Sequence, residues 1–508
     1  MPPQHIFSGD KAPPSAGISR RSFLIKSLTG GSALALGGLA ALLEMSCRSE
    51  QPPNLLIVFP DQMRSQALGF LDEDPVLTPN LDAFARESAV FPQAVSNYPL
   101  CSPYRAMMMT GKYPHSNNVL SNSTSDAARY GYELRQAERC WSDVLKDRGY
   151  CLGYIGKWHL DCPRPPFVKS ANNREDFAWN EWCSPDRRHG FDFWYAYGTY
   201  DQHLNPMYWA TETPRDGAFF VGEWGPVHEA NLAVKYLHNP NRRFRDPRKP
   251  FALVVSMNPP HMPYEQVPER YVRLYDDKDV EDLCRRPNIP PADQKWGQYY
   301  RDNIRNYLAM VTGVDEQFGR ILKTLRDTGL ERNTIVVFTS DHGNCLGIHD
   351  EISKNNHYEE SMRIPLLIRW PGKIQPRRDD LLISVPDLYP TLLDLMGLGQ
   401  GLPDDIEGTS YASLLRTGKG TRPTSQLYLG IPLGQPAWGR RGVRTHTHTM
   451  VVSRMPDQDP RYVLHDNIPD PYQLRNIADE EPEVVRRLIE EELIPWLKKT
   501  KDPWLSLG

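Results

Sequence analysis

Four clusters of polar residues carry side chains that could bind a metal ion, hold an anion or transfer a proton. They are Asp61-Gln62, Lys157 with His159, His261, and Asp341-His342. Each cluster follows a short apolar run rich in β-branched residues, which is typical of a buried strand. Helical patterns separate these runs, so the sequence predicts an α/β fold with a large mixed, mostly parallel sheet between helices. Ligands of such sheets bind beyond the carboxyl ends of the strands, and the four clusters therefore predict one active site.

The elements that must position these clusters can be placed along the chain. We expect strands at 55–59, 150–155, 251–255 and 335–338. The clearest helical pattern covers 303–329, where Ile304, Leu308, Val311 and Phe318 recur near helical spacing. These elements belong to a catalytic α/β domain that we expect over 53–420.

The predicted secondary structure changes after about residue 420. Short strand-like pieces occur at 426–429, 441–443, 450–453 and 461–464. An amphipathic helix follows near 481–498, and its buried face would hold Val485, Leu488, Ile489, Trp496 and Leu497. We therefore expect a smaller C-terminal α+β subdomain over 421–508, with a four-stranded antiparallel sheet and a helix.

Composition narrows the classes of protein. The chain has 508 residues, of which 40% are hydrophobic and 24% are charged, so it is neither a disordered polymer, a collagen-like fibre nor a polytopic membrane protein. The formal net charge of −4 implies no broad basic surface, and we expect no nucleic-acid partner. Besides Cys47 and Cys101 there are six cysteines, which form neither tight pairs nor a CxxC metal pattern.

Residues 1–47 resemble a twin-arginine export signal. Arg20-Arg21 precedes Phe23-Leu24, and the stretch from 27 to 43 is uncharged and rich in Ala, Leu and Gly. The signal implies the Tat translocase as a partner and a periplasmic or extracellular location. Two alternatives stay open: a single N-terminal anchor helix, and a lipid anchor through Cys47.

The strongest signal for chemistry lies at residues 101–111, which read Cys-Ser-Pro-Tyr-Arg-Ala-Met-Met-Met-Thr-Gly. This segment resembles the sulfatase signature, C-x-P-x-R followed by T-G. Further blocks stand in family order: Pro53-Asn54 with Asp61, Gly156-Lys157-Trp158-His159-Leu160, Gly190-Phe191-Asp192, Asp341-His342-Gly343 with His349 and Lys354, Tyr358-Glu359-Glu360, Arg363-Ile364-Pro365, Trp370-Pro371-Gly372, and Asp470-Pro471-Tyr472 with Leu474 and Asn476. Because the resemblance spans 53–480, the sequence is identified as a member of the formylglycine-dependent (type I) sulfatases of the alkaline phosphatase superfamily.

The resemblance implies that Cys101 is oxidised to formylglycine, with a formylglycine-generating enzyme as a partner. A hydrated aldehyde offers two hydroxyls on one carbon. One would attack sulfur and form a covalent sulfated intermediate, and the other would then lose its proton as sulfate is expelled. The alternative for Cys101 is an unmodified buried thiol.

The resemblance also implies one divalent metal ion, held by Asp61, Gln62, residue 101, Asp341 and His342. The commonest family pattern has Asp-Asp and Asp-Asn pairs, so Gln62 and His342 depart from it. Calcium is the ion that the family implies, but Gln62 removes a negative charge and His342 offers a softer nitrogen, which brings manganese or magnesium into consideration. Alternatively, Gln62 and His342 hydrogen-bond to the metal ligands without binding the ion, or they cap the ends of strands.

Further catalytic roles carry over from the family. Arg105 would hold the diol near the metal, and Lys157 and Lys354 would bind sulfate oxygens as point charges. His159 would act as the base that releases sulfate, and His261 as the acid at the leaving oxygen. His349 is expected to be structural, and the roles of His203, His228 and His357 stay open.

An aromatic-rich segment occupies 177–209. It contains Phe177, Trp179, Trp182, Phe191, Phe193, Trp194, Tyr195, Tyr197, Tyr200, Tyr208 and Trp209. These rings could stack on a sugar, but we favour packing of the segment against the domain, because 190–197 resembles a structural block of the family.

Three functions are consistent with the sequence. The first is an exported sulfatase that hydrolyses sulfate esters of a small molecule or oligosaccharide; export and the aromatic residues favour a carbohydrate. The second is a phosphonate monoester or phosphodiester hydrolase that uses the same formylglycine site, since the Asp-Gln and Asp-His pairs resemble that branch. The third is a non-catalytic protein that binds sulfated glycans.

Overall fold

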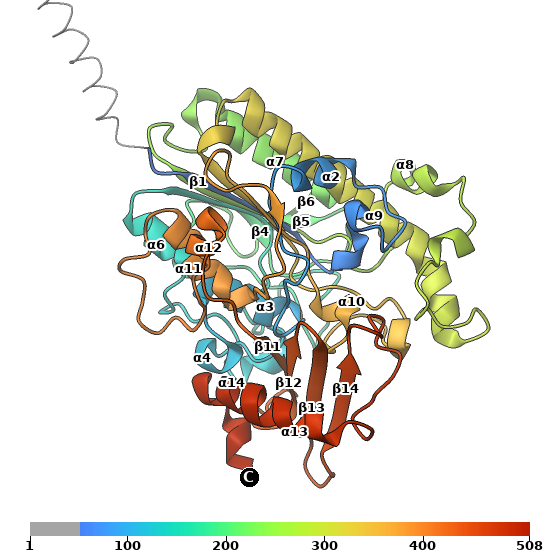
Figure 1. Cartoon of the computed structure of the whole chain (residues 1–508). Helices are drawn as coiled ribbons and strands as arrows, with labels where there is room; N and C mark the ends of the chain where they lie inside the picture. The colour runs from blue at the N-terminus through green and yellow to red at the C-terminus, as the bar shows by residue number, and fades with distance from the viewer. Residues whose placement is uncertain (1–50, 508) are drawn as a thin grey trace, which may run out of the picture. The chain divides into compact units, whose positions relative to one another are not determined.

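The structure, a computed structural model, describes residues 51–507 and is built around a ten-stranded sheet (Figure 1). The strands are β1 (Asn54–Pro60), β2 (Ala89–Val90), β3 (Cys151–Lys157), β4 (Phe193–Tyr197), β5 (Met207–Ala210), β6 (Phe219–Phe220), β7 (Phe251–Met257), β8 (Thr334–Thr339), β9 (Leu366–Arg369) and β10 (Arg377–Arg378). They lie in the order β10-β2-β9-β8-β1-β7-β3-β4-β5-β6. The central strands β8, β1, β7, β3 and β4 run parallel. On either side of them, β9 pairs antiparallel with β8, and β5 pairs antiparallel with β4. The predicted mixed, mostly parallel sheet is confirmed.

Strand β1 explains why helices cover both faces of this sheet. Leu55, Ile57 and Phe59 belong to one hydrophobic core, whereas Leu56 and Val58 belong to another. Side chains alternate between the two faces of a strand, so a run that is apolar at every position requires burial on both sides.

Each face has its own set of helices. The first core includes residues of α3 (Cys101–Thr110), α6 (Trp141–Asp147), α11 (Val385–Leu395) and α12 (Ala412–Thr417). The second includes residues of α2 (Pro79–Ala85), α7 (Gly225–His238), α8 (Glu269–Val272) and α9 (Lys295–Asp327). Three further short helices lie between these elements in the chain: α4 (Pro114–Asn117), α5 (Ser125–Ala128) and α10 (Glu359–Met362).

The longest predicted helix is confirmed but begins earlier than expected. α9 starts at Lys295, whereas the periodic pattern suggested 303. Its predicted core residues Ile304, Leu308, Val311 and Phe318 are fully buried. The first turns are anchored by Gly297 instead, where an added Cβ would lie 1.9 Å from the carbonyl oxygen of Pro291. Tyr300 is buried as well, so the buried face of the helix extends to its first turns, where glycine and tyrosine replace the aliphatic residues of the predicted pattern.

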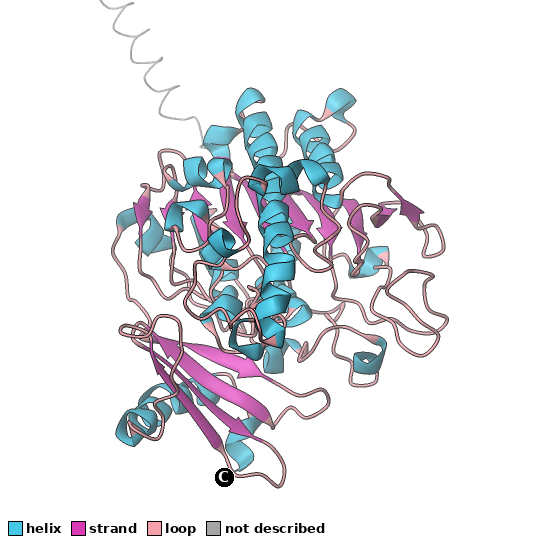
Figure 2. Cartoon of the chain, turned by 90° about the vertical axis from the view of Figure 1, so that its right-hand side faces the viewer, coloured by secondary structure: helices cyan, strands magenta, loops and turns pink. Residues whose placement is uncertain are grey.

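A second, four-stranded antiparallel sheet follows in the chain (Figure 2). It consists of β11 (Ser425–Gly430), β12 (Gly439–Thr445), β13 (His448–Arg454) and β14 (Arg461–Asp466). The predicted C-terminal helix is confirmed as an unbroken helical run over 482–499. It consists of α13 (Pro482–Leu488), a π-helical turn (Ile489–Leu493), which was not predicted, and α14 (Ile494–Lys499). Pro495 lacks an amide hydrogen, so a regular helix could not be completed there.

The smaller sheet shares a core with the larger one. Leu427, Val443 and Met450 belong to the same hydrophobic cluster as the residues of α3, and the chain from Pro52 onward forms one compact unit. The expected four-stranded antiparallel sheet and helix are present, but they pack as part of this unit, and the boundary at residue 420 stays a prediction.

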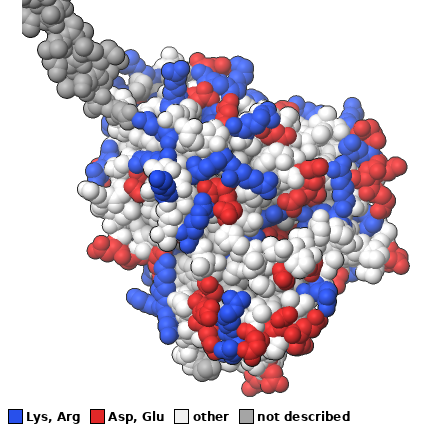
Figure 3. Space-filling view, viewed as in Figure 1, with Lys and Arg blue, Asp and Glu red and all other residues white. Residues whose placement is uncertain are grey.

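Several expectations concern the ends and the surface of the chain. The export signal over 1–47 and the lipid anchor at Cys47 lie outside the described residues. Within 51–507, no helix is both long enough and apolar enough to span a membrane, and every cysteine is free of a disulfide. Basic and acidic side chains are interspersed over the face shown in Figure 3.

Candidate active site

The carboxyl edge of the large sheet brings the predicted polar clusters together. Asp61 directly follows β1, Lys157 ends β3, and Asp341 comes two residues after β8. His261 comes four residues after β7, and Cys101 is the first residue of α3. Parallel neighbours end at the same edge, so residues almost 300 positions apart become neighbours.

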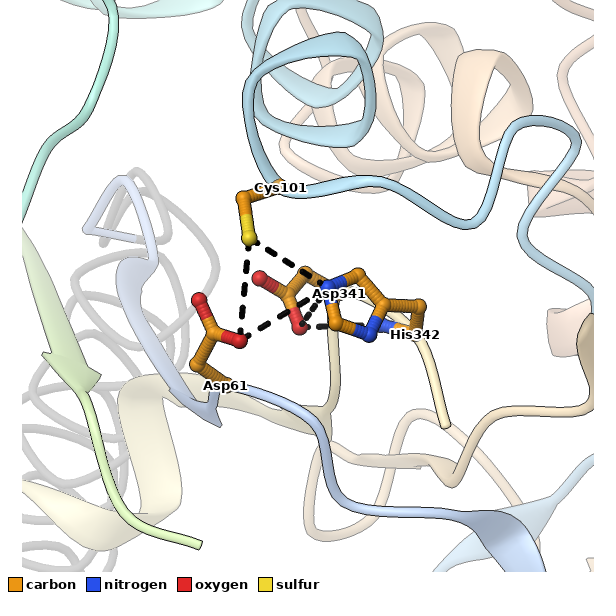
Figure 4. Close-up of side chains that lie close together, drawn as sticks. All are labelled: Asp61, Cys101, Asp341 and His342. Atoms are coloured by element: carbon orange, nitrogen blue, oxygen red, sulfur yellow. Dashed lines mark hydrogen bonds and ion pairs between the residues drawn. The ribbon is translucent and has the colours of Figure 1, made fainter. Parts of the chain in front are cut away.

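Four of these side chains converge on one point (Figure 4). The ligand atoms of Asp61, Cys101, Asp341 and His342 lie within 4.8 Å of one another, and all four residues are buried. Cys101 Sγ lies 3.4 Å from His342 Nε2 and 3.9 Å from Asp61 Oδ1. His342 Nδ1 lies 3.0 Å from the carbonyl oxygen of Gly343 and therefore donates to it, which leaves the lone pair of Nε2 facing the cluster. Two carboxylates and an imidazole nitrogen are a donor set that fits a divalent metal ion.

Arg105 holds the two carboxylates in place. Its Nη2 lies 3.1 Å from both Asp61 Oδ2 and Asp341 Oδ2. Its Nη1 donates to the Lys157 carbonyl at 2.6 Å and to Ser256 Oγ at 2.8 Å. The guanidinium thus ties the ends of β1, β3, β7 and β8 to α3.

The two aspartates have opposite electrostatic surroundings. Burial opposes the ionisation of Asp61, but Lys157 and Lys354 outweigh it and hold the pKa of this carboxyl well below its usual value. Burial, together with the neighbouring charge of Asp61, raises the pKa of Asp341 to about 7. The charge of Arg105, which the two carboxylates share, does not offset this repulsion, and a further cation would favour ionisation of both.

Both predicted lysines point at this cluster. Lys157 Nζ lies 2.7 Å from Asp61 Oδ2 and donates to Asn258 Oδ1 at 3.0 Å. Lys354 Nζ lies 3.4 Å from Cys101 Sγ and 3.8 Å from Asp61 Oδ1. Two cations therefore act on the position of Cys101, as binding of an anionic group requires.

Gln62 contacts the site through both its backbone and its side chain. Its backbone N–H donates to Asp341 Oδ1 at 3.0 Å, and its φ of 68° turns the chain sharply after β1. Its side-chain oxygen accepts from Lys354 Nζ at 2.9 Å, and its nitrogen donates to Ser353 Oγ at 2.9 Å. Gln62 thus orients Lys354, and its role as a metal ligand stays a prediction.

The two predicted acid–base histidines differ in their partners. Within residues 51–507, neither ring nitrogen of His159 has a hydrogen-bond partner, although the ring is buried. Burial, Lys157 and Arg105 lower the pKa of His159 well below its usual value, so the ring is neutral. In contrast, His261 Nδ1 lies 2.6 Å from the Met262 carbonyl oxygen.

The other histidines have structural surroundings. The ring of His349 stacks on Tyr358 with centroids 3.7 Å apart, and its Nε2 lies 3.2 Å from Glu360 Oε2, as its expected structural role requires. His203 Nε2 lies 2.9 Å from the carbonyl oxygen of His261 and steadies that loop. His228 contacts Tyr195 and Glu223, and His357 packs on Tyr358 and His465.

The aromatic-rich segment mostly packs into the protein, as we favoured. Phe191, Trp194, Tyr197, Tyr200, Tyr208 and Trp209 are buried. Trp179 lies near a predicted catalytic residue, since its centroid lies 6.2 Å from that of His159.

Three further residues support the site and were not predicted from the sequence. Ser256 binds Arg105, Asn258 binds Lys157, and Asp201 lies 3.4 Å from His261 Nδ1. A signal was present for each, because all three are polar residues at or just after a strand of the parallel sheet. The strand-end rule that identified Asp61 therefore applies to them as well.

The fold and the site together define a class of enzyme. Cys101 lies at the N-terminus of the ten-residue helix α3, where backbone N–H groups and the helix dipole favour an anion. Two lysines flank that position, and acidic and imidazole groups that could hold a cation lie beside it. Such a site suits a hydrolase that cleaves esters of a strong oxyacid.

Comparison with known families identifies the oxyacid. The sulfatase family model matches residues 53–398, and the model for the C-terminal part of N-sulphoglucosamine sulphohydrolase matches 347–499. The chain belongs to the sulfatase family of the alkaline phosphatase superfamily, and it is a sulfuric ester hydrolase.

Individual relatives agree over nearly the whole length. An endo-4-O-sulfatase of Bacteroides thetaiotaomicron is 39% identical over 93% of this chain and 98% of its own. An ulvan-active sulfatase of Formosa agariphila is 33% identical over 84% of this chain and 77% of its own. The solved structure of the candidate sulfatase yidJ of Bacteroides fragilis superposes with a TM-score of 0.87 at 48% identity, covering 91% of this chain and 98% of that one.

Proposed function

We propose that this protein is an exported sulfatase that releases inorganic sulfate from a sulfated polysaccharide, using formylglycine at position 101 and one divalent metal ion. The observation that carries the proposal is the convergence of Cys101, Asp61, Asp341, His342 and Lys354 on one buried point. The polysaccharide is supported by the two relatives at 39% and 33% identity, which are named for endo-4-O-sulfatase and ulvan-active sulfatase activity. Export is supported by the Arg20-Arg21 motif alone.

The state of the thiol supports its modification. Burial and the charge of Asp61 raise the pKa of the Cys101 thiol, so an unmodified side chain stays protonated and nucleophilically weak at neutral pH. A formylglycine-generating enzyme would convert this side chain to an aldehyde, and the hydrated aldehyde would place two hydroxyls where Sγ now stands. One hydroxyl attacks sulfur, and the bond from sulfur to the alcohol oxygen breaks.

The surrounding residues handle the anion and the protons. Lys157, Lys354 and the N-terminus of α3 bind the sulfate oxygens. His261 gives a proton to the departing alcohol oxygen. His159, which is neutral and has both ring nitrogens unpaired within 51–507, then takes the proton of the second hydroxyl, so that sulfate leaves and the aldehyde returns.

The metal ion would be held by Asp61, Asp341, His342 and the modified residue 101, with Gln62 as a further oxygen donor. When bound, it would neutralise negative charge on the sulfate oxygens. We propose calcium, the ion that the family implies. Manganese and magnesium are the ions to compare with it, because Gln62 offers an amide where a carboxylate is usual and His342 offers a nitrogen where an amide oxygen is usual.

Two measurements test the proposal. Protein from a host that contains a formylglycine-generating enzyme should yield a Cys101 peptide with the mass of the aldehyde, and metal analysis should find one divalent ion. The same protein should hydrolyse aryl sulfates faster than aryl phosphonate monoesters or phosphodiesters. An unmodified thiol in active, metal-bound protein contradicts the formylglycine mechanism, and faster phosphonate hydrolysis contradicts sulfate as the preferred ester.

A further inference from the structure

His261 has a carboxylate behind it that no catalytic motif includes. Asp201 Oδ1 lies 3.4 Å from His261 Nδ1, and the same nitrogen lies 2.6 Å from the Met262 carbonyl oxygen. A carbonyl can only accept a hydrogen bond, so Nδ1 carries a hydrogen. Nε2 is then the ring atom that remains to exchange a proton with a substrate.

Asp201 is held in place from two sides. Asn172 Nδ2 donates to Asp201 Oδ2 at 2.6 Å, and Asn172 Oδ1 accepts from the Asp201 backbone N–H at 3.0 Å. Asn258 Nδ2 donates to Asp201 Oδ1 at 3.2 Å, while Asn258 Oδ1 accepts from Lys157 Nζ at 3.0 Å. The carboxylate that faces His261 is thus rigidly connected to a lysine that contacts the site.

The charges around His261 explain why such a carboxylate is needed. Burial, Lys354 and Lys157 together lower the pKa of His261 to about 3, against the opposing charges of Asp201 and Asp61. Burial opposes the ionisation of Asp201, but His261 and Lys157 hold its pKa at about 2, so it is ionised at neutral pH. With this pKa the ring of His261 is neutral at neutral pH; it takes up a proton from solvent when an anionic sulfate group binds beside it, and Asp201 then stabilises the imidazolium that forms.

We propose that Asp201 is a positioning residue for the sulfatase reaction: it orients His261 with Nε2 toward the leaving oxygen and stabilises the imidazolium that protonates this oxygen. The inference rests on the proposed role of His261 as the acid. As the bond from sulfur to oxygen breaks, its electron pair stays on the alcohol oxygen, which takes the Nε2 proton. His261 becomes neutral, and Asp201 keeps its charge throughout.

This role makes Asp201 a determinant of which sulfate esters are cleaved. Nitrophenolate leaves without being protonated, whereas a sugar alkoxide is far more basic and requires the acid. Asp201 therefore matters for alkyl and sugar sulfates and hardly at all for activated aryl sulfates.

The experiment compares D201N with wild type on 4-nitrophenyl sulfate, phenyl sulfate and a sugar sulfate that the wild type turns over. The parameter is kcat/KM, which reports the step that breaks the bond to the leaving oxygen. We expect a loss of about tenfold or less on 4-nitrophenyl sulfate and roughly 10²-fold on the sugar sulfate, with phenyl sulfate between them. D201E, which keeps the charge, should recover part of the loss on the sugar sulfate.

Matched variants separate this role from a structural one. E223Q removes the carboxylate 3.2 Å from Nδ1 of another histidine, His228, and should change no substrate selectively. H261A should show the same dependence on the leaving group, and adding D201N to H261A should lower kcat/KM by less than about twofold. An equal loss on all three esters, or no loss on the sugar sulfate, overturns the proposal.

Failure of the proposed function would look different. It would appear in the wild type, as an absence of sulfate release from every ester or as full activity of C101A. Neither result depends on Asp201.

Discussion

Two buried charged regions of this protein are built in opposite ways. In the first, which we call the α10 cluster, Glu360 pairs with Arg286, Asn288 and His349, and Glu359 pairs with Arg444. Burial opposes the ionisation of both glutamates, but the arginines outweigh it and hold both pKa values below the usual range. Every charge there has its partner within the chain.

The active-site cluster is the second region, and its charges do not balance in this way. Asp61 and Asp341 share Arg105, the pKa of Asp341 is raised, and the ring of His159 has no hydrogen-bond partner within 51–507. Two buried carboxylates beside two lysines, with their pKa values shifted in opposite directions, are typical of a functional site. We expect the α10 cluster to support stability and the active-site cluster to support turnover, so substitutions should separate the two.

The largest effect is expected at Cys101, the proposed nucleophile. C101A should reduce kcat/KM for an aryl sulfate by at least about 10⁴-fold, because no other side chain can form the sulfated intermediate. Its melting temperature should stay close to that of the wild type, since one small sulfur group is removed and no ion pair is broken. Activity of C101A near the wild-type level would show that position 101 is not the nucleophile.

The next largest effect concerns sulfate binding. K354A should lower kcat/KM by about 10²- to 10³-fold, since it removes a cation 3.4 Å from Cys101 Sγ. K323A is the matched control, because Lys323 is 70% exposed on α9 and pairs with Asp327. Equal losses in the two variants would mean that the lysine charge acts only at long range.

In the α10 cluster, a substitution should reduce stability instead of activity. E360Q should lower the free energy of unfolding by about 3 kcal/mol, because Arg286 stays buried with a weaker partner. The activity of each folded molecule should be unchanged. E490Q, in an exposed ion pair with Arg486, should change the unfolding free energy by less than about 1 kcal/mol.

The same variant predicts a pH dependence of known sign. The pKa of Glu360 in the folded protein is depressed below 4.5, so its ion pair contributes fully above that pH and is lost as the pH falls further. The free energies of unfolding of wild type and E360Q, measured by denaturant titration, should therefore become equal in acid. A difference that grows as the pH falls would contradict the assigned pairing.

The smallest effect is expected for the affinity of the site for a metal ion, which should change about tenfold for each pH unit. Burial and Asp61 raise the pKa of Asp341 to about 7 in the metal-free protein, so binding of a metal ion must displace a proton below that pH. Chelator competition should show affinity falling about tenfold per pH unit below about pH 7. D341N should bind weakly with little pH dependence, and a pH-independent wild type would exclude Asp341 as the proton-linked ligand.

Particular residues show how far sequence reasoning reached. Strand ends followed by polar residues located Asp61, Lys157, His261 and Asp341 on one edge, because burial on both faces leaves a readable apolar run. The same rule applies to Asp201, which follows β4, but it could not predict the contact of this carboxylate with His261, since that contact joins two loops whose paths no local pattern encodes. It also did not predict the π-helical turn before Pro495.

The sequence by itself determined the family, the parallel strands, the edge where chemistry occurs and the residues at positions 101, 157, 341 and 354. These follow from local patterns of burial and from motif spacing, which depend on near neighbours in the chain. The tertiary structure alone decided that Arg105 bridges both aspartates, that Gln62 orients Lys354, and that the pKa values of Asp61 and Asp341 move apart. The physical reason is that charge interactions depend on distance and burial, and both are set only when strands remote in sequence end at the same edge.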